Sequence, residues 1–366
     1  MKILLLGEYS NVHATLAKGL RSLGHEVTVA SDGDNWKNYP RDINLRRRWN
    51  NLLGGASYLP RLLNQFRHFR GYDVVQLINP VFLPLRAERI APFYRYLRRH
   101  NGKVFLGAFG MDHYWVRAGL DCTTFRYSDF NIGCRQRLEG ENKIFIRDWL
   151  DGAKGILNRY VAKDCDGIIA GLYEYYASYA PHYKDKLTYI PFPIQLPQPK
   201  PHALQAVPRP IRFFIGIQRS RSRYKGTDIM LRALERVAAE YPRQAEIVRV
   251  ESVPFAEYCR LMNGSHVILD QLYSYTPAMN ALEAMARGIV VVGGGEPEHY
   301  ELLQEPQLRP IINVDPTESS VYNALKALIE HPERLPQLSA DSIEYIRRHY
   351  DHVKVAQRYL DFWNRQ

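Results

Sequence analysis

The chain has 366 residues, of which 46% are hydrophobic and 24% are charged, and its formal net charge is +11. This composition is typical of a globular protein and leaves room for two domains. No apolar run approaches the roughly 20 residues that cross a bilayer, and the first one, residues 3–6, is too short for a signal peptide. The four cysteines form no C-x-x-C pair, which argues against zinc or a disulfide framework and predicts a reducing, cytoplasmic location.

The positive charge is concentrated between residues 41 and 100, where twelve arginines and no lysine stand beside three acidic residues. A basic surface suits an anionic partner such as nucleic acid, a membrane surface or a phosphate-bearing substrate. Residues 44–70 mix large apolar side chains with arginines and are interrupted near residues 54–55 and at Pro60. Two interpretations stay open: a helix packed on a sheet, or a segment lying on the anionic inner face of the plasma membrane. Nucleic acid is not an expected partner, because the arginines lack a recognised reading motif.

Alternating strands and helices predict that the first half is an α/β domain. Residues 2–6 are predicted to form a buried strand, residues 13–23 a helix and residues 26–30 a second strand, which opens a doubly wound parallel sheet. Further strands are expected at 74–77, 104–106 and 167–170, with helices at 92–99, 149–163 and 174–179, and residues 188–191 are expected to end the first domain. The turn after the first strand keeps only Gly7 of the G-x-G-x-x-G pattern, which argues against an NAD site. Gly7 remains a candidate donor- or phosphate-binding residue.

Three stretches of the first half carry candidate chemistry. Asp32 and Asp34 form a D-x-D pattern that can hold a metal-bound nucleotide sugar, but directly after a strand they are ordinary turn formers, so no metal is expected. Asp112 and His113 follow the strand 104–106, where open α/β sheets place their ligands, and they are candidate catalytic residues. The alternative is a turn aspartate and a packed histidine. Residues 121–148 are irregular, polar and aromatic, and we expect a binding loop on the acceptor side of a cleft.

Seven prolines lie between residues 191 and 210, and they predict an extended linker at 196–210 between domains 1–195 and 211–349. In the second domain, strands are expected at 211–215, 245–250, 267–270, 289–292 and 310–314, and helices at 228–241, 321–330, 342–349 and 353–363. The loop after its first strand reads GIQRSRSRYKGTD. Its basic side chains, Arg219 and Lys225 among them, suit either a phosphate cradle or a solvated loop.

Residues 268–295 form the most informative stretch of the chain. Thr276 is predicted to be the N-cap of a helix over residues 277–287, with Pro277 at its first position and Gly288 closing it. Bare N–H groups of the first turn would then form an anion site, and Glu283 would share their face. A diphosphate on the amides and ribose hydroxyls on Glu283 would suit a nucleotide. These N–H groups belong to Ala278, Met279 and Asn280.

The two α/β halves, the proline-rich linker, the basic loop before Lys225-Gly226 and the run LEAMARGIVVVGG together resemble GT-B glycosyltransferases, closest to the retaining family 4 group. The resemblance covers nearly the whole chain. It implies two Rossmann-like domains facing a cleft, with a C-terminal helix at 350–366 that returns to the first domain. It also implies that Arg219 and Lys225 hold the donor diphosphate and Glu283 the nucleotide ribose, with no metal or other cofactor.

The sequence departs from this family at two motifs. The first glutamate of the family's pair, which touches the donor sugar, falls at Tyr275. The family's H-G-x-D motif is matched at Gly110 and Asp112, but Phe109 replaces the histidine.

The resemblance implies a retaining glycosyltransferase that moves a sugar from a nucleoside-diphosphate sugar to a glycan or lipid-linked acceptor, in polysaccharide or glycolipid synthesis. The donor would bind the second domain and the acceptor the first. One alternative is a non-catalytic GT-B module that binds a nucleotide or glycan, which the departure at Tyr275 motivates. Another is a GT-B epimerase or phosphorylase, although the sequence offers no persuasive cofactor-bearing lysine for a phosphorylase.

Overall fold

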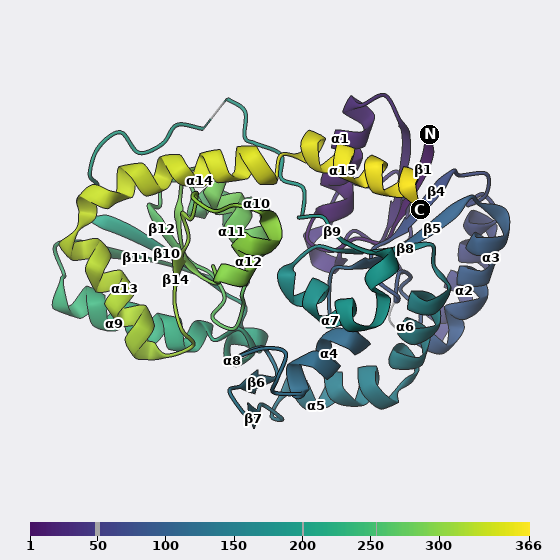
Figure 1. Ribbon diagram of the computed structural model, residues 1–366, viewed down its shortest axis with the longest axis horizontal. Helices are drawn as coiled ribbons and strands as arrows, with labels where there is room; N and C mark the ends of the chain where they lie inside the picture. The colour runs from purple at the N-terminus through teal and green to yellow at the C-terminus, as the bar shows by residue number, and fades with distance from the viewer. Residues whose placement is uncertain (48–51, 200, 254) are drawn as a thin grey trace. The chain divides into compact units, whose positions relative to one another are not determined.

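A computed structural model describes residues 1–47, 52–199, 201–253 and 255–366, and these residues form two α/β units (Figure 1). Unit 1 comprises residues 1–118, 143–193 and 352–366, and unit 2 comprises residues 119–142 and 194–351. The chain therefore passes between the units four times. No helix in the described parts of the chain is long and apolar enough to span a membrane.

Unit 1 is built on a parallel sheet with the strand order β3-β2-β1-β4-β5-β8-β9. Continuous apolar runs form its central strands because helices cover both faces of the sheet. The strands are β1 (Lys2–Leu6), β2 (Glu26–Ser31), β3 (Ile43–Asn44), β4 (Val74–Leu77), β5 (Lys103–Ala108), β8 (Gly167–Ala170) and β9 (Leu187–Tyr189). The helices are α1 (Val12–Ser22), α2 (Leu52–Phe66), α3 (Ala91–His100), α4 (His113–Leu120), α5 (Glu141–Ile146), α6 (Ala153–Asp164), α7 (Tyr173–Tyr183) and α15 (His352–Arg365), of which α4 and α5 extend across the unit boundary.

Helix α2 differs from the sequence-based expectation in one respect. It runs without interruption through residues 54–55 and Pro60, because its apolar face is held by the core of unit 1. Tyr58, Leu62 and Phe66 are buried in that core, whereas Leu63 on the opposite side is 54% exposed. The helix is thus packed on the sheet, as the first of the two interpretations expects. The part of the basic segment at residues 48–51 lies outside the described residues.

The C-terminal helix α15 belongs to unit 1 and lies beside α1 (Figure 1). A Cβ atom at Gly19 of α1 would lie 2.2 Å from the carbonyl oxygen of His352, so this close approach requires glycine. Trp363 is fully buried in unit 1, and its Nε1–H donates to Gln76 Oε1 at 3.4 Å.

Unit 2 contains a second parallel sheet with the strand order β11-β10-β12-β13-β14. These strands are β10 (Ile211–Ile217), β11 (Ala245–Glu251), β12 (Val267–Leu269), β13 (Val290–Gly293) and β14 (Ile312–Asn313). The helices are α8 (Ser222–Lys225), α9 (Thr227–Glu240), α10 (Phe255–Met262), α11 (Met279–Met285), α12 (Pro297–Leu303), α13 (Glu318–Glu330) and α14 (Leu335–His349). A small hairpin of β6 (Asn131–Ile132) and β7 (Arg135–Gln136) also belongs to this unit. The two parallel sheets confirm the predicted α/β fold class.

Two domain boundaries differ from those expected. Residues 119–142, which we refer to as the arm, were expected in the first domain, but they pack on unit 2. The expected linker at 196–210 also belongs to unit 2, where the Leu204 N–H donates to Ser339 Oγ at 3.1 Å. Both differences arise from contacts between residues that are distant in sequence.

Each sheet has a topological switch point, where consecutive connections leave in opposite directions. In unit 1 it lies between β1 and β4, because β2 flanks β1 on the other side. In unit 2 it lies between β10 and β12, because β11 flanks β10 on the other side. Open α/β sheets bind ligands at the carboxyl ends of the strands at such points.

Candidate functional site

Two loops border the switch point of unit 2. The basic loop after β10 ends at Lys225, and the segment after β12 begins at Asp270. The Leu272 N–H donates to the Lys225 carbonyl at 2.9 Å, which joins the two loops. Gly226 then takes a left-handed conformation with φ of 72°, and a Cβ there would meet Leu272 at 2.6 Å. The lysine backbone is therefore held at the sheet edge.

The Asp270 carboxylate lies at the centre of this site, although the sequence analysis did not select it. Burial raises its pKa, while the charge of Lys225, the Asn280 side chain and the N–H groups of Gln271 and Ala278 act in the opposite direction. Asn280 Nδ2 donates to Asp270 Oδ1 at 3.1 Å. Lys225 and Asn280, which we predicted as phosphate ligands, are thus gathered around one buried carboxylate.

The helix start at this site differs from the prediction. Helix α11 begins at Met279, after Ala278 in an extended conformation, and Thr276 is not its N-cap. Thr276 is instead fully buried, and its carbonyl accepts a hydrogen bond from Ser274 Oγ at 2.6 Å. The Tyr275 carbonyl accepts the Glu296 N–H at 3.0 Å, and this long-range contact keeps the segment extended where local capping preference favours a helix.

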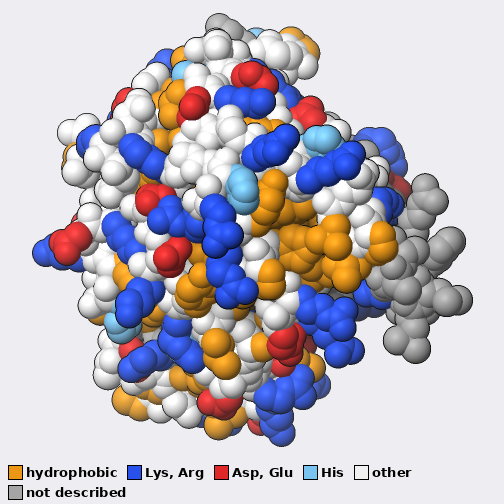
Figure 2. All heavy atoms as spheres, turned by 90° about the vertical axis from the view of Figure 1, so that its right-hand side faces the viewer, with side chains coloured by type: hydrophobic (Ala, Val, Ile, Leu, Met, Phe, Trp, Pro, Cys, Tyr) orange, Lys and Arg blue, Asp and Glu red, His pale blue; other side chains and the backbone are white. Residues whose placement is uncertain are grey.

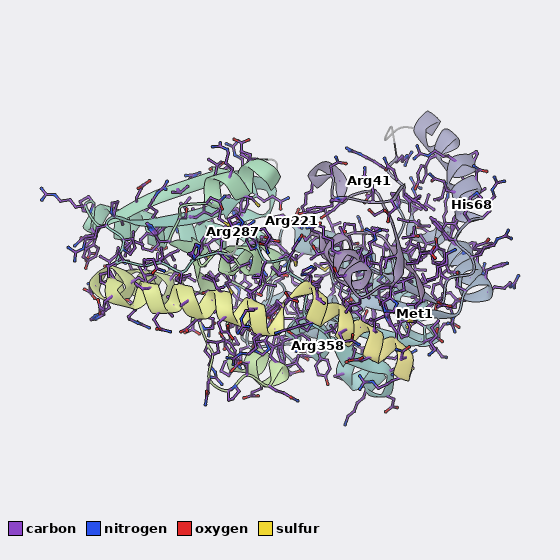
Figure 3. All side chains as sticks on the ribbon, turned by 90° about the horizontal axis from the view of Figure 1, so that it is seen from above. Met1, Arg41, His68, Arg221, Arg287 and Arg358 are labelled. Atoms are coloured by element: carbon purple, nitrogen blue, oxygen red, sulfur yellow. The ribbon has the colours of Figure 1, made fainter. Side chains whose placement is uncertain are left out.

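Two predictions about the ligand groups of this helix also need correction or refinement. The Ala278 N–H is not bare, because it donates to Asp270. Met279 is buried. Glu283 lies on α11, and its Oε2 accepts from an Arg287 guanidinium N–H at 2.7 Å. Figure 3 labels Arg287 in unit 2. A ribose at Glu283 would therefore share the carboxylate with this arginine.

Arg219 is placed differently from Lys225. Its side chain is 80% exposed, and its Nε donates to Glu251 Oε2 at 2.5 Å, at the end of β11. This ion pair raises the Arg219 pKa. Arg249 contacts the same carboxylate. Arg219 is thus engaged by an acid that the sequence analysis did not consider, whereas Lys225 lies at the switch point.

Tyr275, at the place of the family's first glutamate, faces the arm. Its side chain is 2% exposed, and its Oη accepts the Arg126 N–H at 2.7 Å. Its ring centre lies 5.0 Å from that of Tyr127 and 5.7 Å from that of Phe125. The irregular segment expected on the acceptor side of the first domain thus borders the candidate donor site of unit 2.

In unit 1, Gly7 and Glu8 border the switch point between β1 and β4. Gly7 has φ of 87°, and a Cβ there would lie 2.2 Å from Ile78 Cγ2, so its position is set by packing. Glu8 accepts the N–H groups of His13 at 3.2 Å and Ala14 at 2.9 Å, and it thereby caps α1. Burial raises the Glu8 pKa to about 8. The capping carboxylate was missed because it precedes the helix by four residues.

The candidate catalytic residues of unit 1 are both buried and bonded. Asp112 Oδ1 accepts the Trp115 N–H at 2.9 Å and so caps α4, and its Oδ2 accepts the Tyr179 hydroxyl at 2.9 Å. Burial raises the Asp112 pKa to about 7. The His113 ring donates from Nδ1 to the Trp149 carbonyl at 2.8 Å, and burial lowers its pKa. These contacts match the turn aspartate and packed histidine of the alternative interpretation.

The D-x-D residues form a turn in the structure. The Asp34 N–H donates to Asp32 Oδ1 at 3.0 Å. Asp34 Oδ2 accepts from the Ser10 N–H at 2.9 Å and from Lys37 Nζ at 2.6 Å, so the loops after β1 and β2 are tied together. Ser10 and Asp34 both have positive φ. In the described ranges, no three acidic, histidine or cysteine side chains gather in a way that could hold a metal ion.

Comparisons with known proteins bear on the whole chain. Residues 217–361 match the family model described as glycosyl transferase-like. The structure resembles a sucrose-phosphate synthase from Thermosynechococcus elongatus, with a TM-score of 0.62, 13% identity, and coverage of 100% of this chain and 99% of the other. It also resembles Anabaena HepE in complex with UDP-glucose, with a TM-score of 0.62, 11% identity and full coverage of both chains. For WaaG, a glycosyltransferase involved in lipopolysaccharide biosynthesis, the TM-score is 0.51 and the identity 11%, with 99% of each chain covered. Comparison with curated protein sequences finds no match.

Proposed function

We propose that this chain, which has the fold of the GT-B glycosyltransferases and a C-terminal region similar to the glycosyl transferase-like family, is a nucleotide-sugar-dependent glycosyltransferase. It would transfer a sugar from a nucleoside-diphosphate sugar to a glycan or lipid-linked acceptor, with retention of configuration. Unit 2 would bind the donor and unit 1 the acceptor. The HepE structure holds UDP-glucose, so a UDP-sugar is the first donor to test.

The observation that carries this proposal is the position of Lys225 at the switch point of unit 2. Parallel α/β sheets bind nucleotides at such points. The nearby Asn280 side chain supplies polar groups, and Glu283 on α11 supplies a carboxylate for ribose hydroxyls. Departure of a nucleoside diphosphate develops negative charge on its phosphates. A fixed ammonium group at Lys225 would stabilise that charge more in the transition state than in the ground state.

In this proposal Asp270 has the role of aligning the lysine. The buried Asp270 carboxylate lies close enough to Lys225 for the lysine charge to act on its pKa, and we propose that this attraction keeps the ammonium group at the strand end before the donor arrives. Burial raises the pKa of Asp270, and the lysine charge, the Asn280 hydrogen bond and two backbone N–H groups favour its charged form against that effect. Preorganised charge of this kind costs no rearrangement during the reaction.

We propose a positioning role for Asp112 and His113 on the acceptor side. Asp112 caps α4 and binds the Tyr179 hydroxyl, so its carboxyl group is engaged on both oxygens. His113 binds the Trp149 carbonyl through its ring. Both therefore support the shape of the loop after β5.

A thermal-shift screen against UDP-, GDP-, ADP- and TDP-sugars without added metal tests the donor assignment. A ligand that binds only the folded protein at 100 times its Kd adds about 2.7 kcal/mol to the free energy of unfolding, which raises the melting temperature. We expect one nucleotide to produce a shift that Lys225→Ala and Glu283→Ala reduce. A folded protein that shifts with none of these donors would contradict the proposal.

Tyr275 favours a second candidate function, a GT-B module that binds a nucleotide or glycan without turning it over. Where the family has a sugar-binding glutamate, this chain has a buried tyrosine whose hydroxyl is bonded to the arm. The two functions differ in one measurement. Release of free nucleoside diphosphate from the bound donor, with an acceptor extract present, supports the transferase, and binding without release supports the module.

An anionic membrane surface at the cytoplasmic face remains a proposed partner of unit 1. The face drawn in Figure 2 carries hydrophobic side chains surrounded by many Lys and Arg side chains. Exposed apolar residues of this unit include Leu63 on α2 and Ile156 on α6. Sedimentation with anionic and neutral liposomes tests the proposal, because electrostatic binding must need anionic lipid and weaken with salt. Equal binding to both liposomes, or none, would contradict it.

A further inference from the structure

The arm is fixed to unit 2 by a charged cluster at one end. The Arg126 guanidinium donates to Glu296 Oε2 at 2.6 Å and also pairs with Glu298. The Tyr127 hydroxyl donates to the other oxygen of Glu296, which is buried. Asn313 Nδ2 donates to that same oxygen at 2.9 Å. A buried carboxylate with three donors is costly to disrupt, so this end of the arm is firmly held.

Residues 129 and 137 of the arm form hydrogen bonds with the basic loop that leads to Lys225. Arg137 donates to the Arg223 carbonyl at 2.8 Å and lies 3.5 Å from the Tyr224 carbonyl oxygen. The Tyr224 hydroxyl donates to Asp129 of the arm at 2.6 Å. These contacts hold both residues that precede Lys225.

The Arg137 contacts lie at the C-terminal end of helix α8. This helix ends at Lys225. The Gly226 N–H donates to its Ser222 carbonyl and the Leu272 N–H to its Lys225 carbonyl. Arg137 supplies a donor to the Arg223 carbonyl, which lies between them. A cation near the C-terminus of a helix can donate hydrogen bonds to its last carbonyls. Arg137 therefore acts as a C-terminal cap of α8, although it lies 86 residues before Arg223 in the chain.

Arg137 also contacts Tyr273, which follows β12 and packs against Gly226. Its guanidinium carbon lies 3.7 Å from the ring centre of Tyr273, a cation–π contact. A Cβ at Gly226 would lie 2.9 Å from Tyr273 Cε2, so the ring is packed against the residue after Lys225. Lys225 is thus flanked on both sides by backbone that Arg137 fixes directly or through Tyr273.

We propose that Arg137 is a positioning residue for the donor diphosphate: the arm presents its guanidinium to the end of α8, which holds Lys225 toward the phosphates. This inference rests on the proposed nucleotide-sugar function of unit 2. It adds that a segment between α4 and α5, outside both donor-binding loops, shapes the phosphate site. Because coupling is reciprocal, nucleotide binding also stabilises docking of the arm.

The test compares Arg137→Ala with Arg135→Ala in the full-length protein. Arg135 is an exposed residue of the same hairpin, so its removal makes the same change in net charge without touching α8. We expect Arg137→Ala to weaken UDP binding by about tenfold in calorimetry, through loss of charge-assisted hydrogen bonds to α8. Arg135→Ala should bind UDP as the unmodified protein does.

Three further measurements separate positioning of Lys225 from general damage to the fold. Uridine lacks phosphates, so its affinity should be the same in Arg137→Ala and Arg135→Ala, whereas local unfolding would weaken uridine as well. In a Lys225→Ala background, Arg137→Ala should cause no further loss of UDP affinity, because both changes act through one group. Arg137→Lys should recover part of the loss, since it keeps the charge but not the planar fork.

Hydrogen exchange without nucleotide gives a result that is independent of the proposed function. Amides of residues 222–228 should exchange faster in Arg137→Ala than in Arg135→Ala. Equal exchange in the two variants, or equal UDP affinity where the unmodified protein binds UDP, would overturn the role of Arg137. Failure of the unmodified protein to bind any nucleotide would instead overturn the proposed function, and the exchange result would still decide whether Arg137 holds the loop.

Discussion

Replacement of Lys225 by alanine gives the most direct measure of the candidate donor site. The substitution removes the ammonium group that lies beside the buried Asp270 carboxylate. A hydrogen bond to a charged group contributes about 1.5–3 kcal/mol, which corresponds to a loss of about 10- to 150-fold in nucleotide affinity. The loss should fall within that range, because the phosphates lose a charged hydrogen-bond donor.

The contribution of Asp270 can be isolated with a second substitution. At an effective dielectric constant of about 20, two like unit charges a few ångströms apart repel by about 3–4 kcal/mol. Asp270→Asn in the Lys225→Ala background removes this repulsion and keeps a polar side chain of similar size. We therefore expect the double variant to bind UDP at least about tenfold more tightly than Lys225→Ala alone.

Isothermal titration calorimetry with UDP at fixed ionic strength measures both effects. Lys326→Ala is a matched control, since Lys326 on α13 pairs with Glu240 and Glu330 and is not part of the site. Equal UDP affinity in Lys225→Ala and Lys326→Ala would refute the assignment of Lys225 to the phosphates. A double variant as weak as Lys225→Ala would refute the electrostatic account of Asp270.

Three other substitutions probe the ribose site and two stabilising features. Glu283→Ala should weaken UDP binding by about tenfold but leave 2′,3′-dideoxy-UDP unchanged, because only the ribose hydroxyls reach the carboxylate. Gly7→Ala should lower the free energy of unfolding by about 3 kcal/mol, because it combines a φ of 87° with a Cβ placed 2.2 Å from Ile78. Glu305→Gln should lower it by about 2–3 kcal/mol at pH 7, and this difference should vanish as pH falls toward 2.

The sign of the Glu305 effect follows from its contacts. Burial alone would raise the pKa of this carboxyl group, but the Leu308 N–H, the His349 ring, the Gln307 N–H and Arg348 outweigh burial and lower it to about 2. A lowered pKa in the folded state stabilises the protein above the unfolded pKa near 4.5, and the benefit is lost between pH 4.5 and pH 2. Denaturant unfolding at pH 7 and pH 2.5 measures it. A difference that does not depend on pH would show that the Glu305 charge contributes nothing.

Gly7 and Glu283 have equally specific controls. Gly24 has φ of 84° but no atom within 4 Å of an added Cβ, so Gly24→Ala isolates the conformational cost. Equal destabilisation of the two glycine variants, measured by urea unfolding, would show that the contact of Gly7 with Ile78 is unimportant. For Glu283→Ala, a parallel loss of affinity for UDP and for its dideoxy analogue would rule out a contact with the ribose.

Much of the fold is visible in the sequence because its determinants are local. Residues 3–6 and 289–292 are wholly apolar and residues 74–77 are apolar except for Gln76, and each stretch forms or overlaps a central parallel strand. Gly24 and Gly288 have positive φ and follow α1 and α11, as their position after an amphipathic run suggests. The basic loop follows β10 and Glu283 lies on α11, as the sequence places them, and their roles in binding stay predictions.

The positions that the sequence could not assign depend on contacts between distant residues. Local preference favours Thr276 as an N-cap, but the pairing of Tyr275 with Glu296 delays the helix to Met279. The arm looks like a loop of the first domain because it follows that domain in the chain. The arm is attached through Arg126 and Arg137. Their hydrogen-bond partners, Glu296 and the Arg223 carbonyl, lie 170 and 86 residues later in the chain, in unit 2.

The sequence by itself therefore determined the layered α/β architecture and the general location of the candidate donor site. Hydrophobic periodicity and glycine or proline punctuation act over a few residues and are readable without a structure. Only the tertiary structure decided that Asp270 faces Lys225 and that Arg137 of the arm caps the helix carrying it. Such pairings depend on three-dimensional proximity, because the free energy of a charge or hydrogen bond is set by which partner group folding brings within a few ångströms.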